Sequence, residues 1–315
     1  MCFHKVFFIK TKRRMETFFK NARPQLGDSS IATYVSIIKG LSKQMKQDFS
    51  DPMDVIKHSD AILSHLQSVQ PSTRKTRLAC LIVFISKTPG NEPAVEAFRK
   101  RMMKDKETVE EEDKKQTTTE RQDEGWLPWE ELMSKYVVLK KEVAPLLKKD
   151  ALDKREFQRV QTFVLLSCLL LVPPRRSLDY TAFKIGDINP ETDNFLLYEK
   201  RKPYMVFNQY KTVKTYGIQR IPVPTLLHNI LKQWMRLNPH PYLLMNYGQT
   251  AHLNQTQLTQ LLYKFFDKPI STSMIRHLYL TEKYKDVPAV KEMEATATAM
   301  GHSVKEALTV YTKKK

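Results

Sequence analysis

Hydrophobic residues recur at intervals of three and four positions through most of the first hundred residues. In residues 29–45, for example, Ile31, Tyr34, Ile37, Ile38 and Leu41 fall at helical spacing. The same spacing recurs in three further segments, at residues 51–68, 72–88 and 92–106. The pattern predicts a small four-helix domain over residues 15–105.

The pattern breaks at residues 106–125, "KETVEEEDKKQTTTERQDEG", where Val109 is the only large apolar residue. Such a segment cannot bury a core, so it is typical of a charged linker or an exposed loop. We expect a second domain to follow it over residues 126–315, with Trp126 and Trp129 anchoring its start.

The second domain opens with "EFQRVQTFVLLSCLLLV", residues 156–172, which is apolar on nearly all sides and is typical of a buried helix. Pro173 and Pro174 end that helix. Strand-like runs then cover residues 194–199, 204–210 and 216–224, with "KTVKT" as a hairpin loop between the last two. Helical spacing returns in five later segments, at residues 224–237, 254–266, 271–284, 288–301 and 303–314. The predicted fold class is α+β, mostly α, with a small antiparallel sheet in the second domain.

The net charge of the chain says more about its partner than its overall composition does. The chain has 315 residues and a formal net charge of +18, which favours a polyanionic partner, most often nucleic acid. A basic arm over residues 1–14 contains "KTKRR", a pattern of nuclear addresses and of DNA-contacting arms. No apolar run has the length of a membrane span, so we expect no membrane partner.

Three cysteines, Cys2, Cys80 and Cys168, lie far apart without a CxxC pair. They indicate neither a zinc site nor a disulfide framework, and they fit a reducing, intracellular setting.

Five short segments carry candidate chemistry: "PPRRSLD", "YKTVKT", "STSMIRH", "MGHS" and "LTVY". Attack on a phosphodiester needs a nucleophile, and a tyrosine hydroxyl is one. Fixed cations must meet the charge on the non-bridging oxygens, and the arginine fork suits this role. An acid such as lysine or histidine must protonate the leaving oxygen.

In this order, the segments resemble the tyrosine recombinase family, the phage-integrase type of site-specific DNA recombinases. Arg176 and Asp179 match the family's arginine followed three residues later by an acid, with Arg175 as an off-register alternative. The family's lysine lies on a strand hairpin, where Lys211 matches and Lys214 is the runner-up.

The later boxes of the family also have counterparts. Its His-x-x-Arg-His box reads "SMIRH", so that Arg276 and His277 match and Ser273 replaces the leading histidine. Ser273 can donate a hydrogen bond to phosphate but is not a strong base. The Leu-Gly-His box appears as "MGH" with His302, and Tyr311 follows at the family's spacing.

Each residue also has a plainer interpretation. One of the two neighbouring arginines can mark where the buried helix reaches solvent, and the two lysines can be solvated turn residues. Arg276 fits a surface position poorly, since Met274, Ile275 and Leu278 beside it are apolar. A structural role for His277 is as plausible as a catalytic one.

The resemblance implies a fold, an activity and a partner. The fold would be a helical core-binding domain and a catalytic domain that clamp double-stranded DNA. Tyr311 would form a 3′-phosphotyrosyl link, with Arg176 and Arg276 on the phosphate, Lys211 protonating the leaving 5′ oxygen, His302 orienting the nucleophile, and Asp179 supporting the first arginine. The chemistry needs no cofactor and no metal.

The resemblance also bears on assembly and biological role. A homo-tetramer would form on paired DNA sites, with little self-association of the free protein, because only "TKKK" follows Tyr311. The sequences of these motifs most resemble those of integrases from viruses, virophages and mobile elements of eukaryotic hosts. Such an integrase would act in the host nucleus or at a viral replication site.

Two rival functions stay open. A type IB topoisomerase uses the same chemistry but rejoins the original strand. A DNA-binding protein with a decayed catalytic site is the other, and Ser273 favours it.

Overall fold

The computed structural model describes residues 13–199, 202–299 and 304, and it divides into two compact units. Unit 1 takes in the chain up to Thr117 and again from Pro288, and unit 2 runs from Thr118 to Val287. His302 and Tyr311 lie outside the described residues. The proposed limits of 15–105 and 126–315 stay predictions, and the described residues after Pro288 group with unit 1.

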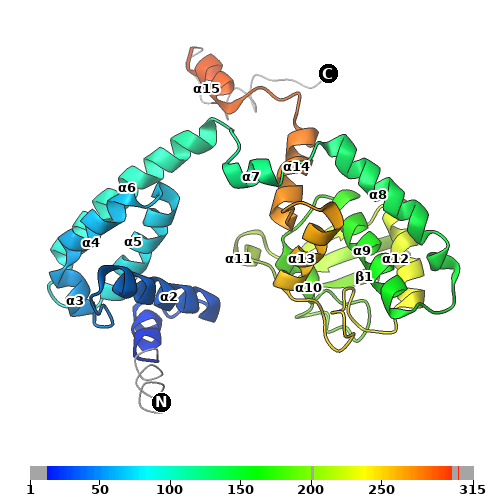
Figure 1. Cartoon of the computed structure of the whole chain (residues 1–315), viewed down its shortest axis with the longest axis horizontal. Coiled ribbons are helices and arrows are strands. Elements are labelled where there is room, and N and C mark those ends of the chain that lie inside the picture. The colour runs from blue at the N-terminus through cyan, green and yellow to red at the C-terminus, as the bar shows by residue number, and fades with distance from the viewer. Residues whose placement is uncertain (1–12, 200–201, 300–303, 305–315) are drawn as a thin grey trace. The chain divides into compact units, whose positions relative to one another are not determined.

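Unit 1 is helical (Figure 1). A helix over residues 13–22 begins inside the stretch expected to be a basic arm. It is followed by α2 (Asp28–Met45), α3 (Pro52–Lys57), α4 (Ser59–His65), a 3₁₀ turn (Leu66–Ser68), α5 (Pro71–Ile85), α6 (Glu92–Lys114) and, from the far end of the chain, α15 (Val290–Ala299).

The core of unit 1 follows the predicted periodicity. Ile31, Ile38 and Leu41 of α2 are buried, whereas Tyr34 and Ile37 are only partly buried against the same core. α5 and α6 pack along each other. α15 joins the unit through an ion pair of 3.2 Å between Lys114 and Glu294.

The segment expected to be a loop, residues 106–125, is mostly helical instead. α6 continues to Lys114, and α7 (Glu120–Glu124) starts from a capping box at Thr119. Lysine and glutamate are good helix formers, and an ion pair of 3.5 Å between Lys106 and Glu110 joins successive turns. A helix that buries few residues leaves no hydrophobic period, which is why the pattern missed it.

Unit 2 is also mainly helical but contains a small sheet. Its helices are α7, α8 (Trp129–Val143), α9 (Lys154–Leu170), α10 (Ser177–Thr181), α11 (Val213–Tyr216), α12 (Thr225–Leu237), α13 (Gln255–Phe266) and α14 (Thr272–Lys283), with a 3₁₀ turn at Leu146–Lys148. Its strands are β1 (Phe195–Glu199), β2 (Lys202–Phe207) and β3 (Gln219–Pro222). They pair antiparallel in the order β1-β2-β3, with Phe195 opposite Val206 and Tyr204 opposite Pro222. The fold class expected from the sequence, mostly α with a small antiparallel sheet, is confirmed.

α9 is the central helix of unit 2, as its apolar sequence predicted. Twelve of its residues are buried. One of them, Gln161, satisfies both ends of its amide on the backbone of Met245, at 2.9 and 2.6 Å. Trp126 and Trp129 pack on this core, and Trp129 meets Tyr279 edge to face. The two tryptophans therefore attach this part of the chain to the core of unit 2.

Candidate functional site

Two arginines of unit 2, Arg176 and Arg276, lie close enough for their charges to interact. α9 ends before Pro173, and Arg176 is the N-cap residue of the next helix, α10. Arg276 lies on α14, where its neighbours Met274, Ile275 and Leu278 are buried. Both arginines are half-buried, and within the described residues no hydrogen bond or ion pair occupies either guanidinium.

The two guanidiniums repel each other, and this repulsion affects the pKa of Arg276. Burial lowers the pKa of Arg276 below its usual value, and the positive charges of Arg176 and Arg175 lower it further, against the opposing charge of Asp179. The residue stays protonated at neutral pH, since an arginine starts from so high a value. The pair is therefore a concentrated positive site that an anion would stabilise.

Asp179 is the acidic member of this cluster and is almost completely buried. Its Oδ2 accepts a hydrogen bond of 2.8 Å from Nε of Arg175, so its direct partner is Arg175 and not Arg176. Its Oδ1 is buried without a hydrogen-bond partner in the part of the chain described. Burial raises the pKa of Asp179, although the charges of all three arginines oppose that rise.

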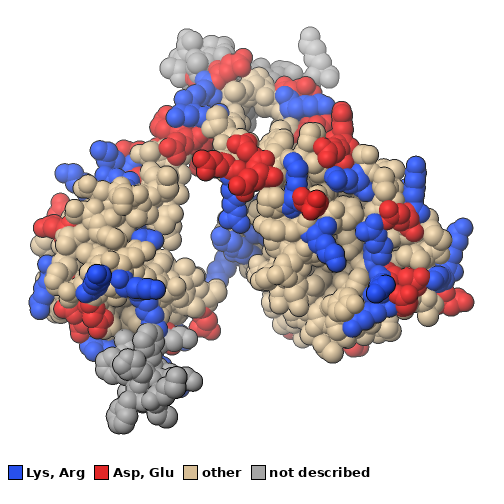
Figure 2. Space-filling model, in the orientation of Figure 1, with Lys and Arg blue, Asp and Glu red and all other residues tan. Residues whose placement is uncertain are grey.

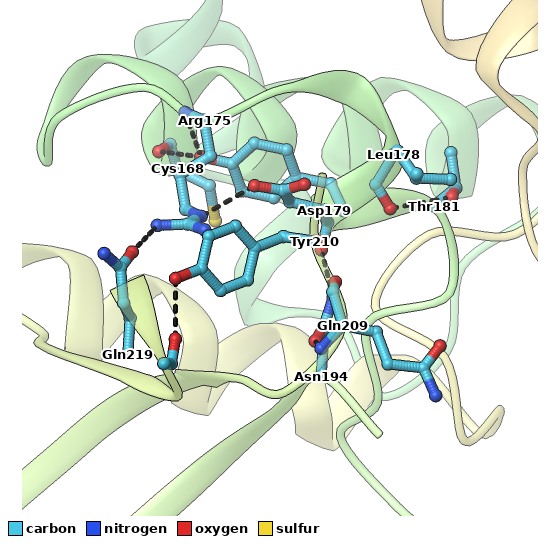
Figure 3. A network of polar contacts seen from close by, with 11 residues as sticks. Cys168, Arg175, Leu178, Asp179, Thr181, Asn194, Gln209, Tyr210 and Gln219 are labelled. Carbon is cyan, nitrogen blue, oxygen red and sulfur yellow. Dashed lines mark hydrogen bonds and ion pairs between the residues drawn. The ribbon is translucent and has the colours of Figure 1, made fainter. Parts of the chain in front are cut away.

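Arg175 and Arg176 are adjacent in sequence but differ in their surroundings. Arg175 donates to Asp179 and, at 2.5 Å, to Oε1 of Gln219. Its guanidinium lies 4.0 Å from the ring centre of Phe207 and 4.6 Å from that of Tyr210. Figure 3 shows Arg175 reaching between Gln219 and Asp179 beside the ring of Tyr210. Of the two arginines, Arg176 is the one left open to a ligand.

The two candidate lysines lie on the connection between β2 and β3. Lys211 follows the buried Tyr210 directly, and Lys214 lies in α11; both are exposed. Lys211 lines a pocket of about 300 Å³ with Leu178 and Thr181 of α10. The structure thus brings Lys211 next to the helix that follows Arg176.

Ser273 and His277 lie one turn apart on α14, and both are exposed. They line a second pocket, of about 310 Å³, together with Arg121 and Tyr263. A ring nitrogen of His277 lies 3.3 Å from the amide nitrogen of Gln122. His277 is therefore exposed and is not a core histidine.

Three residues of this region were missed by sequence reasoning: Phe207, Tyr210 and Gln219. They flank the predicted hairpin loop and surround Arg175. The aromatic residues bordering a two-lysine loop were the available signal, but their contact with Arg175 depends on the tertiary fold.

Outside this arginine cluster, the features relevant to function are the surface charge, any metal ligands and the apolar helices. Figure 2 shows lysine and arginine side chains over both units, and acidic side chains gathered over the C-terminal part of α6. In the described residues no group of His, Cys, Asp and Glu side chains could hold a metal ion. Among the same residues, no helix is both long and apolar enough to cross a membrane.

Comparison with known proteins gives little. No protein-family model matches the chain, and no curated protein matches it. Among solved structures, the chain is similar to the XerH site-specific recombinase bound to difH substrate in a pre-cleavage complex. The sequences are 15% identical, the match covers 97% of this chain and 92% of that one, and the TM-score is 0.40. An overlap of this quality assigns neither family nor activity, so function rests on the chain's own residues.

Proposed function

We propose that the chain is a site-specific DNA recombinase of the tyrosine type, which cuts and rejoins DNA through a 3′-phosphotyrosyl intermediate. The observation that carries this proposal is the Arg176–Arg276 pair. Two half-buried guanidiniums that repel each other and lack a partner among the described residues form a preorganised site for a doubly contacted anion. A phosphodiester is the anion that matches the arginine fork and the basic charge of the chain.

In the proposed reaction the Tyr311 oxygen attacks phosphorus. A bond forms between that oxygen and phosphorus while the bond from phosphorus to the 5′ oxygen breaks. Arg176 and Arg276 hold the charge that develops on the non-bridging oxygens. Lys211 gives its proton to the departing 5′ oxygen, and His302 orients the tyrosine and takes part in removing its proton. The 5′-hydroxyl of a partner strand then reverses the same steps, so no external energy source is required.

The biological role extends the same proposal. Residues 15–105 would bind the duplex together with the catalytic residues 126–315, and four copies would assemble on two paired sites. The sequences of the motifs favour integration or excision of a viral or mobile-element genome as the biological role.

A nicked suicide duplex carrying candidate element ends tests the proposal. After incubation and denaturing electrophoresis, the wild-type chain should migrate as a covalent protein–DNA adduct, and Tyr311→Phe should bind the duplex without forming it. An adduct persisting in Tyr311→Phe would assign the attack to another residue. DNA binding without any adduct would favour the decayed DNA-binding protein. Relaxation of plasmids without exchange between sites would favour the topoisomerase.

A further inference from the structure

Arg175 joins three separate pieces of unit 2. Through Nε it binds Asp179 of α10 at 2.8 Å, and through Nη1 it binds Gln219 at the start of β3 at 2.5 Å. Its guanidinium lies over the ring of Phe207, at the end of β2, and over the ring of Tyr210, just beyond β2. Its backbone N–H donates to the hydroxyl of the buried Tyr180, at 3.2 Å. The side chain is therefore fixed at both ends.

The contacts of Arg175 lie at the two ends of the β2–β3 connection. Tyr210 lies near the start of that connection, and Gln219, the first residue of β3, follows its end. The Tyr210 hydroxyl also donates to the carbonyl oxygen of Gly217 at 2.6 Å, which closes the loop on itself. Gly217 has a φ of 66°, a conformation that favours glycine. Lys211 and Lys214 lie inside this closed connection, so whatever holds its ends also places the lysines.

We propose, on the basis of the function proposed above, that Arg175 is a positioning residue that fixes the lysine-bearing β2–β3 connection against the segment carrying Arg176. Arg176 is the next residue in the chain, so the phosphate site and the lysine share one anchor. Arg175 does not bind the phosphate itself. Its guanidinium is engaged by Asp179 and Gln219 and covered by aromatic rings.

Positioning of this kind has a kinetic signature. A displacement of about 1 Å in a reacting group can cost about 10²-fold in rate. Loss of Arg175 should displace the lysine and thereby impair protonation of the leaving 5′ oxygen. It should leave the Arg176–Arg276 phosphate site in place. The defect should then disappear on a substrate whose leaving group needs no proton.

The test compares two nicked duplexes that differ only at the scissile phosphate, one with the natural bridging 5′ oxygen and one with sulfur there. Arg175→Met should slow adduct formation about 10²-fold on the oxygen substrate. On the sulfur substrate the deficit should fall below about tenfold, since general-acid catalysis is no longer needed. Lys211→Met should show the same rescue, and Arg176→Met should remain defective on both substrates. Arg159→Met, an exposed arginine paired with Glu142, is the matched control and should behave as wild type.

Removing Arg175 also strips the buried Asp179 of its partner, so two milder variants are measured beside it. Gln219→Leu and Tyr210→Phe each remove one contact of the connection and should show a smaller deficit with the same rescue by sulfur. If Arg175→Met does not fold, as judged by circular dichroism, these two variants decide the question. An equal deficit on both substrates, or no deficit, would overturn the positioning role. Absence of adduct from the wild-type chain on both substrates would instead refute the proposed function.

Discussion

Each unit contains an arginine–aspartate pair with a buried carboxylate, and the two pairs differ in how many hydrogen bonds that carboxylate accepts. In unit 1, Arg74 binds both oxygens of Asp105, at 2.8 and 2.6 Å, and Arg101 lies 3.3 Å from the same carboxylate. Nη1 of Arg74 donates to backbone carbonyls in and just after the 3₁₀ turn, those of Leu66, Gln67 and Val69. Both arginines of this cluster contact the acid.

In unit 2, Arg175 is the one described arginine that forms an ion pair with the acid. Asp179 keeps one oxygen without a partner among the described residues, while Arg176 and Arg276 add positive charge that no hydrogen bond or ion pair within those residues takes up. Burial raises the pKa of Asp179. Burial would also raise that of Asp105, but its hydrogen bonds and charge pairing with Arg74 and Arg101 hold the pKa of Asp105 below its usual value. A completed pair stabilises a fold, whereas an incomplete one leaves charge available for a ligand.

The largest expected effect is on the satisfied pair. Arg74→Met would leave the buried Asp105 with Arg101 as its remaining cation and would remove the donor to the carbonyls of Gln67 and Val69, which should cost about 3–5 kcal/mol of the unfolding free energy of unit 1. All three tryptophans, Trp126, Trp129 and Trp234, lie in unit 2. In urea, circular dichroism should therefore report an early loss of helix that tryptophan fluorescence does not follow.

The control for Arg74→Met is Arg14→Met, which breaks an exposed ion pair with Asp51. It should cost less than about 1 kcal/mol. Coincident changes in the two signals would mean that the units unfold together and that the pair does not act on unit 1 alone.

The second effect concerns the unsatisfied arginines. Arg176→Ala and Arg276→Ala should each lower the cleavage rate about 10²–10³-fold, because each removes one preorganised contact to the phosphate. Neither change should lower the melting temperature of unit 2, since each relieves repulsion within the cluster. Suicide-substrate assays and thermal melts of the same samples measure both quantities. A variant that loses activity and stability together would place that arginine among the structural groups.

The smallest expected effect is on pH dependence. The unfolding free energies to which Asp105 and Asp179 contribute should change with pH in opposite directions. The folded-state pKa of Asp105 is lowered, so its contribution is present above its unfolded pKa, near 4, and is lost as pH falls through the lower folded value. The folded-state pKa of Asp179 is raised, so unit 2 gains stability as pH falls through that value toward 4.

Urea titrations between pH 3 and 7, with Asp105→Asn and Asp179→Asn beside the wild type, test this difference. Each substitution should remove a pH dependence of opposite sign, on the order of 1.4 kcal/mol for each unit of pKa shift. Equal signs in the two variants would contradict the comparison of the two pairs.

Much of the fold could be predicted from periodicity. The buried helix α9, the strands and the helix carrying Arg276 follow from the spacing of apolar residues, because burial of one face dictates that spacing. The helical residues of 106–114 could not be predicted in this way. Their helix rests on backbone propensity and on ion pairs along its surface, which leave no hydrophobic period.

The candidate site shows a different limit. Two adjacent arginines look equivalent in the sequence, and the family pattern alone chose Arg176. What separates them is the contact of Arg175 with Phe207, Tyr210 and Gln219, which lie more than thirty residues away in the chain. The spacing from Arg176 to Asp179 was equally uninformative about pairing, because the acid binds the arginine four residues before it.

The closed contacts of Arg175 also constrain how this region can evolve. Replacing Arg175 alone exposes the charge of Asp179 to an apolar interior, and replacing Asp179 alone leaves an excess of three neighbouring cations. Substitutions in contact are strongly non-additive, so each single step is less fit than the pair of steps. Neutral drift at these positions should therefore proceed by joint replacement. Lineages that lose Arg175 should also have altered Asp179 or Gln219, while the proposed cleavage of DNA would require Arg176 and Arg276 to persist.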